Sequence, residues 1–213
     1  MTSKRAKILI VVDALPAGGT ETQIVELFRG FKEKKGFILG LCVLKSGGHR
    51  EMEARRYAHF CLPVRQHFEA DVWTCFSLLK WARRHKIDLF HSFGARSDWI
   101  ALFVAKLVGK PVINGSIRSA RPKLNRIDLA SRLSMPWADW VVSNSYAGLA
   151  AFGRSEFKKA SVIHNGIDPG RFDQWRDVQG EPGRLCMVAN FSRKKDQACL
   201  ILALPLILRK ISS

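Results

Sequence analysis

An apolar run that leads into a glycine pair and then an amphipathic segment constrains this chain most. Residues 8–12, Ile-Leu-Ile-Val-Val, predict a buried strand, and Gly18 and Gly19 follow it. Apolar residues then recur at helical spacing, at Ile24, Leu27, Phe28 and Phe31. A helix that starts there points its amides over the carboxyl end of the strand, where anionic or hydroxyl-rich ligands bind. The glycines allow close backbone approach or a positive φ, although a tight turn without a ligand explains them equally well.

The start of the same helix carries a second local signal. Thr20 and Gln23 fit the S/T-x-x-E/Q capping box, in which each side chain bonds the backbone N–H of the other residue. We therefore predict that these two side chains cap the helix.

Further apolar runs alternate with helical patterns along the first 165 residues. This alternation predicts an α/β fold with a parallel sheet flanked by helices. Ligands of such sheets bind beyond the carboxyl ends of the strands. The residues there, 18–19, 91–96, 115–118 and 144–145, are rich in glycine, polar and cationic types and predict one cleft. The predicted strands are residues 7–15, 37–44, 60–64, 88–93, 111–117, 139–144 and 160–164.

The pattern breaks after residue 165. Residues 166–183 are rich in glycine and proline and predict an interdomain linker. A strand is predicted at 184–190 and a helix from Gln197 to about Arg209, which Pro205 should kink or shorten. One strand and one helix are too little to fold unaided, so we expect residues 184–213 to be the start of a truncated second domain.

The charge balance is strongly basic. Thirty-five Lys and Arg residues against 18 Asp and Glu give a net charge of +17, which leaves nucleic acid, anionic lipid and phosphorylated substrates open as partners. Between Arg118 and Met135, cations alternate with apolar residues, as in Arg121, Lys123 and Arg126. This segment predicts an interfacial helix on an anionic membrane, with an ordinary sheet-covering helix as the alternative.

We expect a cytoplasmic protein that is either soluble or attached peripherally to the inner face of the membrane. No apolar run approaches the roughly 20 residues of a membrane span, and the N-terminus does not resemble a signal peptide. Five widely spaced cysteines without a C-x-x-C pair predict buried free thiols. The histidines show no metal-binding spacing, so no metal is predicted.

Several motifs, taken in order, resemble the retaining glycosyltransferases of family four, which have the GT-B architecture of two Rossmann-like domains. The more specific are residues 138–145, a strand that ends in Asn-Ser, and residues 162–168, which contain Asn-Gly-Ile-Asp and lead to Arg171-Phe172. The resemblance implies a Rossmann-like parallel sheet flanked by helices in residues 1–165, the first domain of GT-B. The other matching stretches are residues 18–21, 87–92, 115–118 and 188–196.

In such enzymes the N-terminal domain binds the acceptor and the C-terminal domain binds the nucleotide-sugar. The resemblance therefore implies that Arg193 and Lys195 lie beside the donor diphosphate, whose developing negative charge needs cations. Two departures from the family pattern matter. Asn190 stands where an arginine is common, and Arg118 stands where many members have a histidine, so no catalytic residue is assigned. The residues expected to contact substrate are Gly18, Gly19, Glu21, His91, Arg118 and Asn165.

Each candidate also has a structural interpretation. His91 could be a hydrogen-bonded histidine at the end of a strand, and Asn144-Ser145 could cap the following helix. Asn165-Gly166 could form a turn, and residues 193–195 could be a solvated loop. An unpaired Arg118 at a strand end has little reason to pack, and bidentate binding of phosphate or carboxylate suits it.

The sequence thus favours a retaining glycosyltransferase that moves a hexose from a UDP- or GDP-sugar, without a cofactor, to a lipid-linked or saccharide acceptor. A non-catalytic acceptor-binding or membrane-binding domain is the alternative. Charge alone favours a nucleic-acid partner, and no G-x-G-x-x-G, P-loop or base-stacking pattern supports one. The same missing fingerprint disfavours an oxidoreductase.

Overall fold

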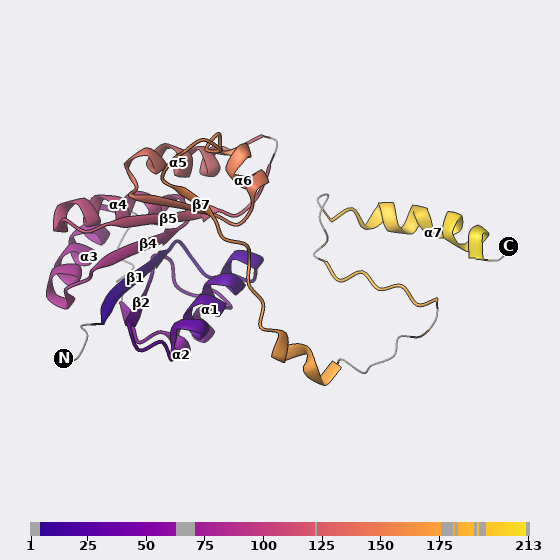
Figure 1. Cartoon of the computed structure of the whole chain (residues 1–213), viewed down its shortest axis with the longest axis horizontal. Helices are drawn as coiled ribbons and strands as arrows, with labels where there is room; N and C mark the ends of the chain where they lie inside the picture. Colours follow the sequence, from indigo (N-terminus) through magenta and orange to yellow (C-terminus); the bar gives the residue numbers. More distant parts are fainter. Residues whose placement is uncertain are drawn as a thin grey trace. The chain divides into compact units, whose positions relative to one another are not determined.

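The computed structural model describes residues 5–62, 71–121, 123–175, 181, 183–189, 191 and 195–211. The chain divides into two compact units, residues 1–168 and residues 169–213 (Figure 1).

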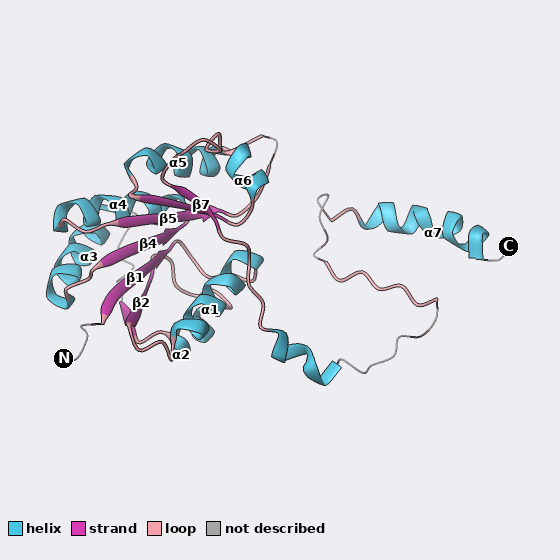
Figure 2. Ribbon diagram, in the orientation of Figure 1, coloured by secondary structure: helices cyan, strands magenta, loops and turns pink. Residues whose placement is uncertain are grey.

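The first unit is built on a parallel sheet. Within its described residues, seven strands pair in the order β3-β2-β1-β4-β5-β6-β7, and each predicted strand is present, starting and ending within a few residues of its predicted bounds. The predicted fold class, a Rossmann-like parallel sheet flanked by helices, is confirmed (Figure 2). The strands are β1 (Ala6–Val12), β2 (Phe37–Val43), β3 (Phe60–Leu62), β4 (Leu89–Phe93), β5 (Val112–Ile117), β6 (Trp140–Ser143) and β7 (Ala160–Val162).

Alternate side chains of β1 enter two different hydrophobic cores. Leu9 and Val11 belong to the core shared with α3 (Asp71–His85) and α4 (Ala95–Val108). Ile10 and Val12 belong to the core shared with α1 (Gly19–Phe31) and α2 (Glu51–Tyr57). Helices therefore cover both faces, as a parallel sheet requires. The remaining elements of this unit are α5 (Arg126–Ser134), η1 (Met135–Trp137) and α6 (Tyr146–Ala151).

Helix α1 forms where its apolar spacing predicts, but its N-terminus differs from the prediction. Ile24 and Phe28 are buried, and Leu27 and Phe31 pack against the same core. The predicted capping box is wrong, because the N-cap is Gly18 and no side chain caps the helix. Gly18 is extended, with φ of −172°, so neither it nor Gly19 uses the positive φ that glycine allows.

An aspartate that follows β1 caps helix α4 from outside. The Oδ1 atom of Asp13 accepts the backbone N–H of Ser97 at 2.6 Å, and Oδ2 accepts that of Arg96 at 3.3 Å. Gly94, just before the helix, has φ of 120°, and a Cβ there would lie 2.5 Å from the Asp13 carboxyl group. This arrangement ties the end of β1 to the junction between β4 and α4.

The second unit contains η2 (Pro169–Trp175) and α7 (Gln197–Ile211). The predicted strand at 184–190 is wrong for residues 184–189, which form no strand, and Asn190 lies outside the described residues. The described residues of this unit offer no partner strand, and an isolated strand cannot satisfy its backbone. Helix α7 runs past Pro205 to Ile211, so the prediction that the proline shortens it is wrong, and the predicted kink stays a prediction.

The prediction that the cysteines are buried free thiols holds only in part. All five are free, but only Cys42 is fully buried, and burial raises the pKa of its thiol to about 12. Cys186 and Cys199 are exposed, because they belong to the second unit, where most described side chains are exposed.

Replacing Asp13 by alanine tests the α4 cap. We expect Asp13→Ala to lower the free energy of unfolding by about 1–3 kcal/mol, because two N–H groups at the start of α4 lose their acceptor. Urea unfolding measures the change. Glu33→Ala, at an exposed position, is the matched control and should unfold like the wild type. An Asp13→Ala variant as stable as Glu33→Ala would contradict this role.

Candidate functional site

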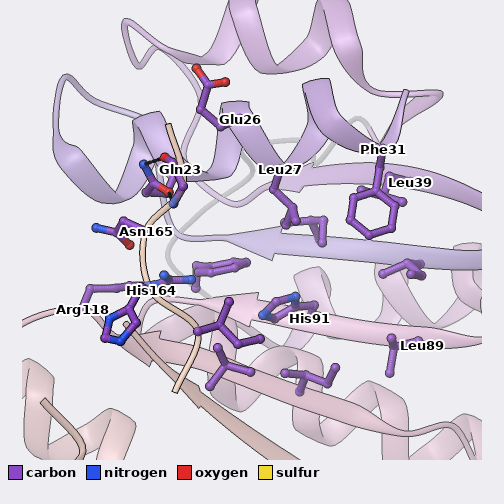
Figure 3. A pocket seen from close by; sticks show the side chains of 17 residues that line it. Gln23, Glu26, Leu27, Phe31, Leu39, Leu89, His91, Arg118, His164 and Asn165 are labelled. Carbon is purple, nitrogen blue, oxygen red and sulfur yellow. Dashed lines mark hydrogen bonds between the residues drawn. The ribbon is translucent and has the colours of Figure 1, made fainter. Parts of the chain in front are cut away.

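A pocket of about 550 Å³ lies against one face of the sheet (Figure 3). Apolar side chains from β1, β2, β4, β5 and β6 form most of its lining, and α1 contributes one side. Residues 163–166, which follow β7, also line it. A largely apolar hollow with a few polar groups is typical of a binding site. The polar side chains that line it are Gln23, Glu26, His91, Arg118, His164 and Asn165.

Gln23 fixes the segment after β7 against α1. Its Nε2 donates to the carbonyl of Gly166 at 2.8 Å, and its Oε1 accepts the N–H of Gly166 at 2.9 Å. Gln23 is thus engaged with a residue far away in sequence, which explains why it does not complete a capping box. The pair of hydrogen bonds holds Asn165 beside the pocket (Figure 3).

Arg118 follows β5 and packs over an aromatic ring. Its Nε donates to the carbonyl of Gly115 at 2.8 Å, and its guanidinium carbon lies 4.8 Å from the centre of the Phe93 ring. The expectation that Arg118 has little reason to pack is therefore wrong. Burial lowers the pKa of Arg118 to about 10, so it remains a cation at neutral pH. The stacked, oriented guanidinium suits bidentate contact with phosphate or carboxylate.

His91 lies beside the same aromatic ring. The His91 and Phe93 ring centres are 4.4 Å apart, and a Cβ on Gly115 would lie 2.6 Å from His91 Nε2. Glycine at position 115 therefore leaves room for this ring pair. Burial, reinforced by the nearby charge of Arg118, lowers the pKa of His91 to about 3, so the imidazole is neutral at physiological pH. The buried Nε2 atom has no hydrogen-bond partner among the described residues.

The ends of β5, β6 and β7 are joined around Asn144. Its Nδ2 donates to the carbonyl of Arg118 at 3.2 Å, and its own carbonyl lies 3.1 Å from Nδ1 of His164. Ser145 accepts the N–H of Gly148 and caps α6, as the structural interpretation of the Asn-Ser pair predicts. Asn144 thus positions the backbone of Arg118.

Beneath this edge of the sheet lies a polar cluster that the sequence analysis missed. The carboxyl group of Asp98 is buried and accepts hydrogen bonds from Ser92 at 2.6 Å, Ser116 at 2.8 Å and Ser131 at 2.5 Å. Burial raises the pKa of Asp98 to about 6, although the three hydroxyl donors oppose that rise. Because Ser116 lies two residues before Arg118, the cluster braces the strand end that carries the cation. The sequence signal that could have revealed the cluster is an aspartate in a mostly apolar helix.

The structure brings together some of the predicted site residues and not others. His91, Arg118 and Asn165 line one pocket. Gly18, Gly19 and Glu21 lie at the N-terminus of α1, ahead of Gln23, and do not line it. The Glu21 carboxylate instead folds back beside Gly18. Lys195, in the second unit, is exposed, and Arg193 and Lys194 lie outside the described residues. The substrate and diphosphate contacts of all these residues stay predictions.

The described part of the chain contains neither a cluster of metal ligands nor a membrane-spanning helix. No three His, Cys, Asp or Glu side chains there converge in a way that could hold a metal ion. No helix there is both long enough and apolar enough to cross a membrane.

Comparison with known proteins decides the family. The family model described as Glycosyltransferase Family 4 matches residues 17–171, well over half of the chain. The chain belongs to glycosyltransferase family 4. The match confirms the family that the motifs predict. The matched residues include every lining residue of the pocket except Ile8 and Ile10 of β1. No curated protein matches the chain.

Solved structures share the fold of this family-4 chain. The apo form of the lipopolysaccharide outer core galactosyltransferase WaaB is 15% identical, with a TM-score of 0.57 over 76% of this chain and 46% of its own. Anabaena HepE in complex with UDP is 17% identical, with a TM-score of 0.62 over 78% and 46%. A glycosyltransferase from Rickettsia africae is 14% identical, with a TM-score of 0.62 over 93% and 49%. The family-4 chain thus spans about half the length of these proteins, and its sheet corresponds to the N-terminal domain of GT-B.

His91 should make the stability of this family-4 chain sensitive to acid. Its pKa is about 3 when folded and 6.5 in the unfolded chain, so the stabilisation is fully present above pH 6.5 and is lost as the pH falls towards 3. At about pH 5 the contribution of His91 to the free energy of unfolding is smaller by about 2 kcal/mol than at pH 8. Asp98 acts in the opposite sense, because its raised pKa stabilises the fold below about pH 4 and that contribution is lost as the pH rises through 6.

Urea unfolding of the wild type and of His91→Leu, compared between pH 8 and pH 5, isolates the contribution of His91. Asp98 is common to both proteins, so its effect cancels in the difference. We expect the wild type to lose about 2 kcal/mol more than His91→Leu over this range. Equal losses would mean that His91 is not held neutral in the folded chain.

Proposed function

We propose that this chain is the acceptor-side part of a retaining glycosyltransferase. The enzyme would move a hexose from a UDP- or GDP-sugar to a lipid-linked or saccharide acceptor, in the synthesis of cell-surface polysaccharide or lipopolysaccharide. The family match and the GT-B fold support sugar transfer, while the donor, the acceptor and the retention of anomeric configuration are parts of the proposal.

The pocket carries this proposal most directly. Its polar end lies where β4, β5 and β7 finish, which is where ligands of parallel α/β sheets bind. Arg118 supplies a fixed cation there, and His91 supplies a neutral imidazole with a buried, unpartnered nitrogen. In the proposed function Arg118 contacts an anionic group of the substrates, and His91 bonds an acceptor hydroxyl. Asn165 adds an amide for a further sugar hydroxyl.

The donor is proposed on two grounds. HepE is described in complex with UDP and with UDP-glucose, so a nucleotide-sugar fits the fold. Lys195 is an exposed cation just before α7, and the resemblance of residues 188–196 to the family implies a contact between Lys195 and the donor diphosphate. Lys195, with Arg193 from outside the described residues, would stabilise the charge that develops on the leaving nucleotide.

A non-catalytic acceptor-binding or membrane-binding domain is the second candidate. The observation that favours it is the pocket itself, whose lining is mostly apolar and which offers binding groups without an assigned catalytic residue. A domain of this kind would keep the pocket and bind an acceptor without transferring sugar to it.

The purified 213-residue chain should show no sugar transfer. The pocket of the first unit offers one cation and no built nucleotide site, so the donor would not be positioned for reaction. Incubation with UDP- and GDP-sugars and a panel of acceptors, followed by mass spectrometry, measures any product. Turnover by this chain alone would overturn the view that it supplies only the acceptor side.

Two substitutions test the cations in a longer, transfer-competent form of the protein. Arg118→Ala and Lys195→Ala should each lower kcat/KM by about tenfold or more, because each removes a charge-assisted hydrogen bond to substrate. Lys158→Ala, at an exposed position outside the pocket lining, is the matched control and should leave the kinetics unchanged. Wild-type kinetics in either test variant would remove that residue from the site.

In this proposal the enzyme works at the inner face of a membrane, because its acceptor is linked to a lipid. The basic segment from Arg118 to Met135 includes α5, where Ile127 and Leu133 are exposed beside Arg126. Arg121 pairs with Asp128 at 3.3 Å, which removes part of the positive charge that the sequence suggested for this segment. In the proposal the remaining cations attract anionic lipid headgroups.

A further inference from the structure

A stretch of β5 just before Arg118 departs from the regular pairing of the sheet. The register between β5 and β4 ends at Asn114. The register between β5 and β6 shifts between Asn114 and Ile117, where β5 has one residue more than β6. Gly115 and Ser116 thus have no paired residue on either of these described neighbouring strands. A bulge of this kind interrupts the ladder, so the conformation of these two residues depends on other contacts.

The peptide group between Gly115 and Ser116 orients the guanidinium of Arg118. Its carbonyl accepts the Nε–H of Arg118 at 2.8 Å. Its N–H, which is the backbone N–H of Ser116, donates to Oδ1 of Asn114 at 3.0 Å. Because a peptide group is planar, the direction of the carbonyl follows from that of the N–H. Contacts that hold Ser116 in place therefore also set the direction in which the guanidinium points.

Ser116 is held by the buried carboxylate of Asp98, which lies in the first turn of α4. The Ser116 hydroxyl donates to Oδ1 of Asp98 at 2.8 Å and accepts the N–H of Gly94 at 2.7 Å. The same Oδ1 accepts the hydroxyl of Ser92 at 2.6 Å. Ser92 is the last residue of β4 that pairs with β5, and His91 directly precedes it. One carboxylate oxygen thus joins β4 and β5 just beyond the point where their ladder ends.

The same network is also anchored on α5. Oδ2 of Asp98 accepts the hydroxyl of Ser131 at 2.5 Å. Nδ2 of Asn114 donates to Ser134 at 3.0 Å, and the Ser134 hydroxyl donates to the carbonyl of Ser131 at 2.8 Å. All four residues are buried. In such surroundings a hydrogen bond that is lost is not replaced by water, so the network holds its geometry firmly.

Stability alone does not account for a carboxylate at this place. Burial of the Asp98 charge costs free energy that its hydroxyl donors return only in part, and an apolar side chain of similar volume would fill the contact at lower cost. Arg118 pairs with no carboxylate among the described residues, and its guanidinium is oriented by the Gly115 carbonyl and the Phe93 ring. The network therefore supports the peptide group on which the direction of this cation depends.

We propose that Asp98 is a positioning residue for Arg118. Through Ser116 it fixes the bulged end of β5, so that the guanidinium is presented to an anionic group of the substrate at the end of the pocket that also holds His164 and Asn165 (Figure 3). The inference rests on the proposed function, in which Arg118 contacts substrate. Its structural part, the fixed direction of the guanidinium, does not depend on sugar transfer and is testable in the 213-residue chain.

Two serines of the network provide a matched pair of variants. Ser116 and Ser131 each donate one hydroxyl to the Asp98 carboxylate, but only Ser116 belongs to the strand that leads to Arg118. Ser116→Ala and Ser131→Ala should both lower the midpoint of urea unfolding, because each removes a buried hydrogen bond. Only Ser116→Ala should release the guanidinium. Ser116→Thr keeps the hydroxyl and should restore what Ser116→Ala loses.

Nitrogen-15 NMR of the Arg118 Nε–H gives a direct measurement in the 213-residue chain. Arg118→Lys removes this signal and thereby identifies it. In the wild type the Nε–H should exchange slowly with water, because it is bonded to the Gly115 carbonyl. Its exchange should be about tenfold faster in Ser116→Ala and in Asp98→Ala, and should differ by less than about twofold in Ser131→Ala and Ser116→Thr. Should Asp98→Ala fail to fold, Ser116→Ala decides, because it leaves the carboxylate in place.

Kinetics of a longer, transfer-competent form separate positioning from stability. Ser116→Ala should lower kcat/KM by about tenfold, whereas Ser131→Ala should leave it within about twofold of the wild type. Arg118→Ala combined with Ser116→Ala should be no slower than Arg118→Ala alone, because no guanidinium is then left to position. A residue that acted only through stability would give losses that add.

Two results would overturn the positioning role. One is an Arg118 Nε–H that exchanges in Ser116→Ala as it does in the wild type; the other is additive loss of kcat/KM in the double variant. If exchange responds as expected while Arg118→Ala leaves the kinetics of the longer form unchanged, the proposed substrate contact of Arg118 fails and Asp98 still positions the guanidinium. The two proposals therefore fail in different measurements.

Discussion

Burial of the parallel sheet on both faces is the constraint on which the first unit depends. Successive side chains of β1 point to opposite sides, so Leu9 and Ile10 belong to different cores, each with its own helices. The backbone of the inner strands of such a sheet is satisfied by neighbouring strands except at the strand ends. Polar chemistry is therefore confined to those ends, and the pocket, the Asp98 cluster and the α4 cap all lie there or beside them.

The site combines a buried cation with a neutral histidine around one aromatic ring. Phe93 contacts both groups: the Arg118 guanidinium lies over its ring, and the His91 ring lies 4.4 Å away between ring centres at a tilt of 34°. Burial, reinforced by the nearby cation, lowers the pKa of the imidazole, and the absence of a side chain at Gly115 leaves room for the ring. None of the three groups could be changed in size or charge without altering the other two.

Apolar runs and helical spacing were enough to predict the seven strands, their parallel arrangement and the buried side of α1. The residue pairs that build the site were not predictable in the same way. Gln23 matched a local capping pattern, but its partner, Gly166, comes 143 residues later, and Asp98 finds its serines on β4, β5 and α5. Arg118 was singled out by residue type, and its packing on Phe93, which depends on strand order, was not predicted. The strand expected at 184–190 failed because apolar residues form a strand only where another strand can pair with them.

The double hydrogen bond between Gln23 and Gly166 has a mechanical consequence. A side-chain amide that donates to and accepts from the backbone of one residue bonds it as a neighbouring strand would, so the chain is anchored two residues before the first unit ends at Asp168. Motion of whatever follows would begin beyond this anchor and would leave Asn165 and the pocket edge in place. This pair of hydrogen bonds is exposed to water, so it opens at a low free-energy cost, and any bend that breaks it would release residues 165 and 166 at the pocket edge from α1.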